Sequence, residues 1–142
     1  MTTPISDGCA CGGGCYEIVG EPLFAGHCHC RECQKVSGGP MMTAVCFPAS
    51  ALRLLQGTPR TYTYRGDSGN PVERFFCRSC GSPLYGRPSL LPGMVLVQAP
   101  SLDDASWVKP AQHVHVSSAQ PWDPTGDDLP CFDKLPPQDR SV

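Results

Sequence analysis

The sequence predicts a small, mainly β domain built from short strands. Glycine and proline contribute 15 and 16 of the 142 residues and are spread along the chain, which disfavours long helices. The segments between them alternate apolar with polar residues, or carry β-branched and aromatic residues, as half-buried strands do. A chain of this length suits one domain, which we place at residues 1–142.

Short strands and a few helical turns account for the first 120 residues. Two helical turns are expected, near 30–36 and at 102–107, where Ser and Asp precede a run that Pro110 ends. From Pro121 onward the chain is rich in Pro and Asp, so we expect it to wrap the surface without regular structure. The predicted strands, in chain order, are residues 15–20, 41–47, 52–57, 60–66, 72–77, 94–100 and 113–118.

The composition excludes several classes of partner. The formal net charge is −2 and the pI is about 6.0, so the chain offers no basic surface for nucleic acid or an anionic membrane. No apolar run approaches the roughly 20 residues that span a bilayer. The first residues lack the charged and then apolar order of a secretory signal, and we therefore expect a cytoplasmic protein.

The 10 cysteines indicate metal binding. The cytoplasm keeps thiols reduced, so a disulfide framework is not expected, whereas C-x-C and C-x-x-C spacings suit convergence on one ion. Cys9 and Cys11 near the start, with Cys77 and Cys80 further along, can supply the four thiolates of a closed structural zinc site. A redox pair at Cys77 and Cys80 is the alternative, although the βαβ context of such pairs is missing.

The segment "HCHCRECQKVSGG" supplies a second group of three cysteines, Cys28, Cys30 and Cys33. Zinc held by three protein ligands keeps a fourth position for water or substrate, and a thiol is a natural occupant beside thiolates. His27 or His29 could instead close this site and make it purely structural. Neighbouring residues of a strand point apart, which disfavours His29 as a co-ligand of the adjacent cysteines.

A second zinc signature overlaps with the same residues. Nucleobase deaminases combine Cys/His-x-Glu with Pro-Cys-x-x-Cys, which "CRE" at 30–32 and "FCRSC" at 76–80 match in part, with Phe76 in place of the proline. This alternative leaves Cys9, Cys11, Cys28 and Cys33 without a role. Three further cysteines stand alone in apolar or Pro-rich surroundings, and we expect them to be small buried hydrophobic residues: Cys15, Cys46 and Cys131.

Five segments occur in an order typical of one family: "CACGGGCYEIVGEP", "CHCRECQKVSGGP", "ERFFCRSCGSPLY", "SLDDASWVKPAQHVHVSSAQPW" and "DDLPCFD". Over about residues 7–135 the chain resembles the glutathione-dependent formaldehyde-activating enzymes, whose domain is shared with centromere-protein-V-like proteins. The resemblance implies a zinc-stapled β-tent of short antiparallel strands with an irregular C-terminal wrap. It also implies two zinc ions per chain, a structural one on Cys9, Cys11, Cys77 and Cys80 and a catalytic one on Cys28, Cys30 and Cys33.

The activity named for this family is the formation of S-(hydroxymethyl)glutathione from formaldehyde and glutathione, a carbon–sulfur lyase reaction. The resemblance therefore implies a small thiol and an aldehyde as partners. The main alternative is a non-enzymatic zinc module that binds a protein partner or senses thiols, because no acid–base pair stands out beyond the cysteines. Glu32 is a candidate proton relay. Glutathione carries two carboxylates, and the candidate cations near the cysteine motifs are Arg31, Lys35, Arg74, Arg78 and Arg87.

Overall fold

The computed structural model describes residues 5–66 and 69–136, and the protein is mainly β, as predicted. The smaller of its two sheets has the order β1-β2-β5, from Ile5–Gly8, Cys15–Ile18 and Leu52–Gln56. The larger sheet has seven strands in the order β10-β3-β4-β9-β8-β7-β6. Its strands are β3 (Phe24–Cys28), β4 (Met42–Pro48), β6 (Arg60–Arg65), β7 (Pro71–Phe76), β8 (Pro83–Pro88), β9 (Met94–Gln98) and β10 (His113–Val114).

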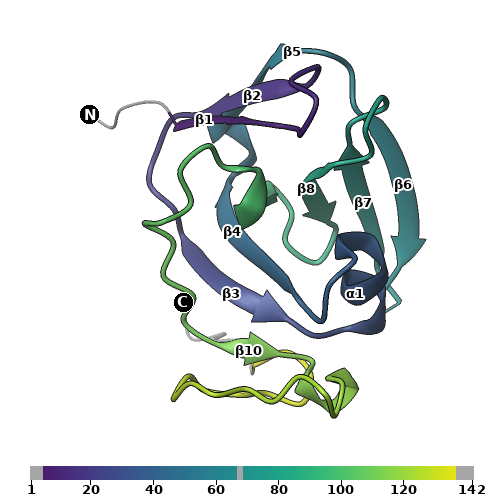
Figure 1. Ribbon diagram of the computed structural model, residues 1–142, viewed down its shortest axis with the longest axis vertical. Coiled ribbons are helices and arrows are strands. Elements are labelled where there is room, and N and C mark those ends of the chain that lie inside the picture. The colour runs from purple at the N-terminus through teal and green to yellow at the C-terminus, as the bar shows by residue number, and fades with distance from the viewer. Residues whose placement is uncertain (1–4, 67–68, 137–142) are drawn as a thin grey trace.

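Neighbouring strands pair antiparallel, except that β10 runs parallel to β3. Figure 1 shows the small sheet at one end of the molecule and β10, with the C-terminal segment, at the other. The hydrophobic core lies between the small sheet and one face of the large one. It is formed mainly by alternate residues of β2, β4 and β9 together with β8: Tyr16, Ile18, Val45, Phe47, Val95, Val97, Leu84 and Tyr85.

One α-helix, α1 (Arg31–Ser37), links β3 to β4, and it agrees with the turn predicted near 30–36. Its N-cap is Cys30, whose sulfur accepts a hydrogen bond from the Cys33 N–H at 3.2 Å. Gly38 ends the helix with φ 76°, a left-handed value that glycine adopts without strain. Single 3₁₀ turns cover Ala49–Ala51, Ala99–Ser101 and Val116–Ser118. None of the helices in the described part of the chain has the length and apolar character needed to cross a membrane.

The second predicted helical turn, at 102–107, is wrong. The polar residues there satisfy local and tertiary hydrogen bonds instead of capping a helix. The Ser101 hydroxyl donates to the carbonyl of Gln98 at 2.8 Å and also contacts the Tyr16 hydroxyl, while Asp104 Oδ1 accepts from the Ser106 N–H at 2.9 Å. Serine and aspartate therefore mark a turn here rather than a helix N-terminus.

The predicted strand at 113–118 is only two residues long, because His115 has φ 56° and the chain then turns into a 3₁₀ segment. The C-terminal segment is irregular, as expected, and its backbone bonds to β10. His113 donates its N–H to the Pro130 carbonyl, and Phe132 donates to the His113 carbonyl, each at 2.9 Å. Cys131, between them, is exposed, so the prediction of a buried residue is wrong there, because its side chain lies outside the core on this added edge.

Candidate metal centres

Four cysteines from distant parts of the sequence meet where the two sheets come together. Cys9 and Cys11 follow β1, and Cys77 and Cys80 follow β7. Their four sulfurs all lie within 4.8 Å of one another. The Cys9–Cys11 and Cys11–Cys77 sulfur pairs are 3.5 and 3.7 Å apart. Sulfurs about 2.3 Å from a tetrahedral zinc ion lie roughly 3.8 Å apart, so this group fits zinc without rearrangement.

Hydrogen-bond donors surround this four-cysteine group and favour the thiolate form of Cys80. The backbone N–H groups of Gly14 and Gly13 donate to the sulfurs of Cys9 and Cys11 at 3.2 and 3.4 Å. Hydrogen bonds from the side chain and backbone of Ser82 lower the pKa of the Cys80 thiol to about 5. Donors aimed at sulfur stabilise the ionised form that binds a metal.

The three-cysteine group lies at the other end of the large sheet, where β3 gives way to α1. Cys28 is the last residue of β3, Cys30 caps α1, and Cys33 lies within its first turn. Their sulfurs are also within 4.8 Å of one another. Hydrogen bonds from Cys28 and Cys33 lower the pKa of Cys30 to about 2, and hydrogen bonds with Cys30 and Cys33 raise the pKa of Cys28. Three sulfurs this close together, one of which ionises readily, are a suitable donor set for one zinc ion.

The grouping of the cysteines argues against two alternatives from the sequence, closure of the three-cysteine group by a histidine and the deaminase pattern. The set of mutually close donor atoms that contains Cys28, Cys30 and Cys33 includes neither His27 nor His29. Closure of the three-cysteine group by either histidine therefore finds no support. The deaminase pattern requires Cys30 to meet Cys77 and Cys80, yet the structure places them in different groups.

A buried cation adjoins the three-cysteine group. Arg74 of β7 is only 7% exposed, and its Nη2 donates to the Cys33 sulfur at 3.4 Å. Its Nε and Nη2 also donate to the hydroxyl of Tyr64, at 3.1 and 2.9 Å. Burial raises the pKa of Tyr64 to about 12, so the hydroxyl stays neutral beside the guanidinium. The permanent charge of Arg74 is thus held against the sulfurs in a fixed orientation.

Strand register explains how residues far apart in the sequence reach this place. Cys28 pairs with Met42 and Ala44 with Gln98, while Arg74 pairs with Gly86, so their side chains share the face of the sheet opposite the core. Met42 joins them, because its sulfur contacts both Arg74 Nη1 and Gln98 Nε2 at 2.9 Å.

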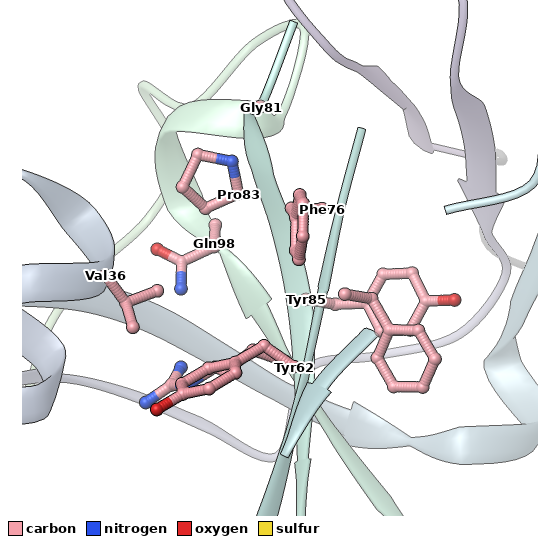
Figure 2. A pocket seen from close by; sticks show the side chains of 9 residues that line it. Val36, Tyr62, Phe76, Gly81, Pro83, Tyr85 and Gln98 are labelled. Atoms are coloured by element: carbon pink, nitrogen blue, oxygen red, sulfur yellow. The ribbon is translucent and has the colours of Figure 1, made fainter. Parts of the chain in front are cut away.

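A cavity of about 300 Å³ opens on this same face. Arg74 and Gln98 line it, as does Val36, which lies one helical turn after Cys33 in α1. In Figure 2, Val36 and Gln98 face Tyr62 across this space, while the ring of Tyr85 points to the other side of the strand. The volume is at the lower end of the roughly 300–1,000 Å³ typical of small-molecule sites. Aromatic and apolar residues form much of its wall, including Tyr62, Phe75, Phe76, Pro83 and Tyr85.

Comparison with known proteins places this arrangement in a family. The model of the family described as "Glutathione-dependent formaldehyde-activating enzyme" matches residues 4–118. The chain belongs to this family. A crystal structure of a Rhodobacter sphaeroides protein has a similar fold, with a TM-score of 0.57 and 24% sequence identity over 75% of this chain and 92% of that chain. No curated protein sequence matches the chain.

In this formaldehyde-activating family member, the seven cysteines predicted as ligands form two groups that could bind zinc. Of the five candidate cations, only Arg74 is buried beside a sulfur; the others are exposed: Arg31, Lys35, Arg78 and Arg87. Glu32 lies in the first turn of α1 and is not among the residues that line the cavity. The sequence placed Arg74 among five candidate cations near the cysteine motifs but did not distinguish it from the others.

Proposed function

We propose that this chain is a zinc-dependent enzyme of the carbon–sulfur lyase type, which joins glutathione to formaldehyde as S-(hydroxymethyl)glutathione. In this proposal Cys9, Cys11, Cys77 and Cys80 hold a structural zinc ion, and Cys28, Cys30 and Cys33 hold a second ion that takes part in catalysis. The observation that carries the proposal is that the buried Arg74 both contacts Cys33 of the three clustered thiols and lines a cavity. The ten free thiols suit a reducing compartment such as the cytoplasm, where glutathione is abundant.

The reaction needs a thiolate close to an aldehyde carbon. When bound, zinc supplies the Lewis acidity that keeps a substrate thiol ionised at neutral pH. The glutathione sulfur then forms a bond to the formaldehyde carbon, and the carbonyl π electrons move to the oxygen. That oxygen takes up a proton equivalent to the one the thiol gave up, so the product is the simple sum of the two reactants.

Arg74 has two parts in this proposal. Its guanidinium compensates the negative charge of the sulfur group through Cys33, and this keeps the three-cysteine group from repelling an incoming thiolate. It also lines the cavity as a fixed cation, and can attract a carboxylate of glutathione. Tyr64 and Met42 hold the guanidinium in place, so little conformational entropy is lost when the substrate binds.

The test is a kinetic comparison of Arg74→Gln with Arg87→Gln in the zinc-loaded protein, with carbon-13 formaldehyde and an exchange NMR readout of product formation. Arg87 is an exposed arginine on the adjoining strand, and it lines a different cavity. We expect the wild type and Arg87→Gln to exceed the uncatalysed rate. Loss of a charge-assisted contact of about 1.5–3 kcal/mol should raise the KM of Arg74→Gln for glutathione roughly tenfold or more.

Metal analysis of the same samples, with and without glutathione, distinguishes the enzymatic proposal from a thiol-sensing module and from a module that binds a protein partner. Formation of product at the uncatalysed rate by a fully zinc-loaded wild type would overturn the enzymatic proposal. If glutathione still displaced or perturbed the metal of the three-cysteine group, a non-enzymatic thiol-sensing module would be the better description. If zinc binding responded to no added thiol, a module that binds a protein partner would be the better description.

A further inference from the structure

A third group of metal-type donors lies apart from the two cysteine groups. It consists of His27 from β3, His113 from β10 and Asp127 from the C-terminal segment, and the nearest donor atoms all lie within 4.8 Å of one another. The two histidines pair directly in the parallel register of β3 and β10, and their rings stack with centroids 4.7 Å apart. His27 pairs with Thr43 rather than Met42, so this histidine group faces away from the three thiols.

The separation of His113 and Asp127 suits a small divalent ion. His113 Nε2 lies 3.1 and 3.0 Å from the two carboxylate oxygens of Asp127. A nitrogen and an oxygen that are each about 2.0–2.1 Å from a tetrahedral zinc ion are separated by roughly 3.3 Å, which needs only a small movement of the exposed carboxylate. His113 itself is fixed, because its side chain is 3% exposed, whereas Asp127 is 46% exposed and can adjust.

Both histidines are already oriented through their second ring nitrogen. His27 Nδ1 bonds to the Thr43 hydroxyl, and His113 Nδ1 bonds to His29 Nε2, each at 2.8 Å. Metal-ligating histidines show this same pattern, in which the outer nitrogen is held by a hydrogen bond and the inner nitrogen faces the ion. The other ring nitrogen of each histidine, Nε2, is thereby turned away from these partners, and that of His113 already contacts Asp127.

His29 provides an independent observation. It is fully buried at 0% exposed, and its Nδ1 has no hydrogen-bond partner among residues 5–66 and 69–136, with the nearest carboxylate oxygen of Asp123 at 3.9 Å. If His113 donates from Nε2 to Asp127 and the rings are neutral, His113 Nδ1 must accept from His29 Nε2. His29 Nδ1 is then a buried lone pair that faces a carboxylate. This arrangement costs free energy, because an unsatisfied polar atom is desolvated without compensation.

An ion between His113 and Asp127 reverses this chain of donors and acceptors. His113 Nε2 then presents its lone pair to the ion, its Nδ1 donates to His29 Nε2, and the proton of His29 moves to Nδ1, where it points toward Asp123. Each buried nitrogen thereby gains a suitable role. We propose that His27, His113 and Asp127 form a divalent transition-metal site, with two nitrogen ligands, one carboxylate and a solvent-facing position left for water.

Two imidazole nitrogens favour a transition metal such as zinc over magnesium or calcium, which prefer oxygen ligands. The role of the ion would be to tie the C-terminal segment to the edge of the large sheet, because Asp127 reaches β10 from an otherwise irregular region. The site does not depend on the function proposed above, and Asp127 lies outside the residues 4–118 that the family model matches.

The test is nitrogen-15 NMR of the histidine rings during titration of the full chain with zinc, after both cysteine groups have been filled. We expect the Nε2 resonances of His27 and His113 to shift with one further equivalent of zinc. Asp127→Ala should bind that equivalent at least tenfold more weakly, while the neighbouring Asp128→Ala should behave as the wild type. The Asp127 side chain is nearly half exposed, so its removal should leave the fold intact.

Equilibrium dialysis at buffered free zinc gives the stoichiometry independently of the spectra. Ring nitrogens that ignore excess zinc in the wild type would overturn the proposal, and so would equal binding by Asp127→Ala and the wild type. Either result would leave His113 and Asp127 as a simple hydrogen-bonded pair.

Discussion

At the scale of single residues, the ten cysteines differ in their environments. Seven converge in two groups, and Cys15 is only half-buried at the start of β2, so the expectation that it is buried is wrong. Of the other two, Cys46 is buried within β4 and Cys131 is exposed on the C-terminal segment. The neighbours in sequence did not distinguish these last two, because Pro130 and Phe132 make the surroundings of Cys131 look apolar. Whether a thiol is covered depends on what packs over it, and that is a tertiary property.

This difference predicts how the two thiols react with iodoacetamide. Burial raises the pKa of Cys46 to about 11, so at pH 8 only about one thiol in a thousand is ionised, and it is also shielded. We expect the zinc-loaded protein to be alkylated at Cys131 at least a hundredfold faster than at Cys46, as measured by peptide mapping. Cys131→Ser should remove the fast site. Comparable rates at the two positions would contradict the burial of Cys46.

At the scale of elements, strands with alternating or β-branched patterns were predicted, whereas β3 and β8, which lack such patterns, were missed. The strands near 41–47, 60–66 and 72–77 are present with shifts of a residue or so. The sequence of β3, "FAGHC", carries a glycine, a histidine and a ligand-type cysteine where apolar residues would signal a strand. Residues of the candidate sites therefore replace the apolar pattern that would identify β3 as a strand. β8 was missed because it begins and ends with proline.

The two cysteine groups were predictable because their spacing is local and chemically distinctive. The meeting of Arg74, Gln98 and Met42 was not predictable, since it depends on the register of four strands. The histidine group likewise requires the parallel pairing of β3 with β10, which no local pattern indicates. Local chemistry is visible in a sequence, whereas the neighbours that complete a site depend on strand order.

In the turn after β5, substitution of Gly57 should strongly destabilise the fold. Gly57 has φ +82°, and a Cβ there would lie 2.4 Å from the carbonyl oxygen of Gly13, in the loop of the four-cysteine group. Gly93 has φ +77°, and a Cβ there would meet no heavy atom of the described residues within 4 Å apart from its chain neighbours, so it is a matched control for the backbone conformation alone. Gly93→Ala should cost about 1–2 kcal/mol. Gly57→Ala should cost at least about 1 kcal/mol more, because backbone must also move.

Urea unfolding of the two zinc-loaded variants measures this difference, and metal analysis shows whether the Gly13 loop still holds its ion. Equal losses of unfolding free energy for Gly57→Ala and Gly93→Ala would contradict the close approach of the two chain segments.

At the scale of the whole molecule, the two cysteine groups constrain the chain very differently. Cys11 and Cys77 are separated by 66 residues, so an ion on the four-cysteine group joins the small sheet to the large one and closes a long loop. Cys28, Cys30 and Cys33 lie within six residues of one another, and an ion there closes almost no loop. Cross-links that close long loops stabilise a fold most, so stability should depend chiefly on the four-cysteine group.

This contrast predicts opposite outcomes for two chemically identical substitutions. Cys77→Ser removes a cysteine from the proposed structural site. Zinc binding at sites of this kind contributes about 10–16 kcal/mol to folding in small zinc domains, so we expect a loss of about 3 kcal/mol or more. For a chain of this size that loss corresponds to a fall in Tm of roughly 10 °C. Cys30→Ser should lose one zinc equivalent and any thiol-dependent activity, yet unfold within a few degrees of the wild type, because α1 and the end of β3 remain held by the sheet. Calorimetry with parallel metal analysis measures both quantities. If Cys30→Ser were the less stable variant, the division into a structural and a catalytic ion would have to be reversed.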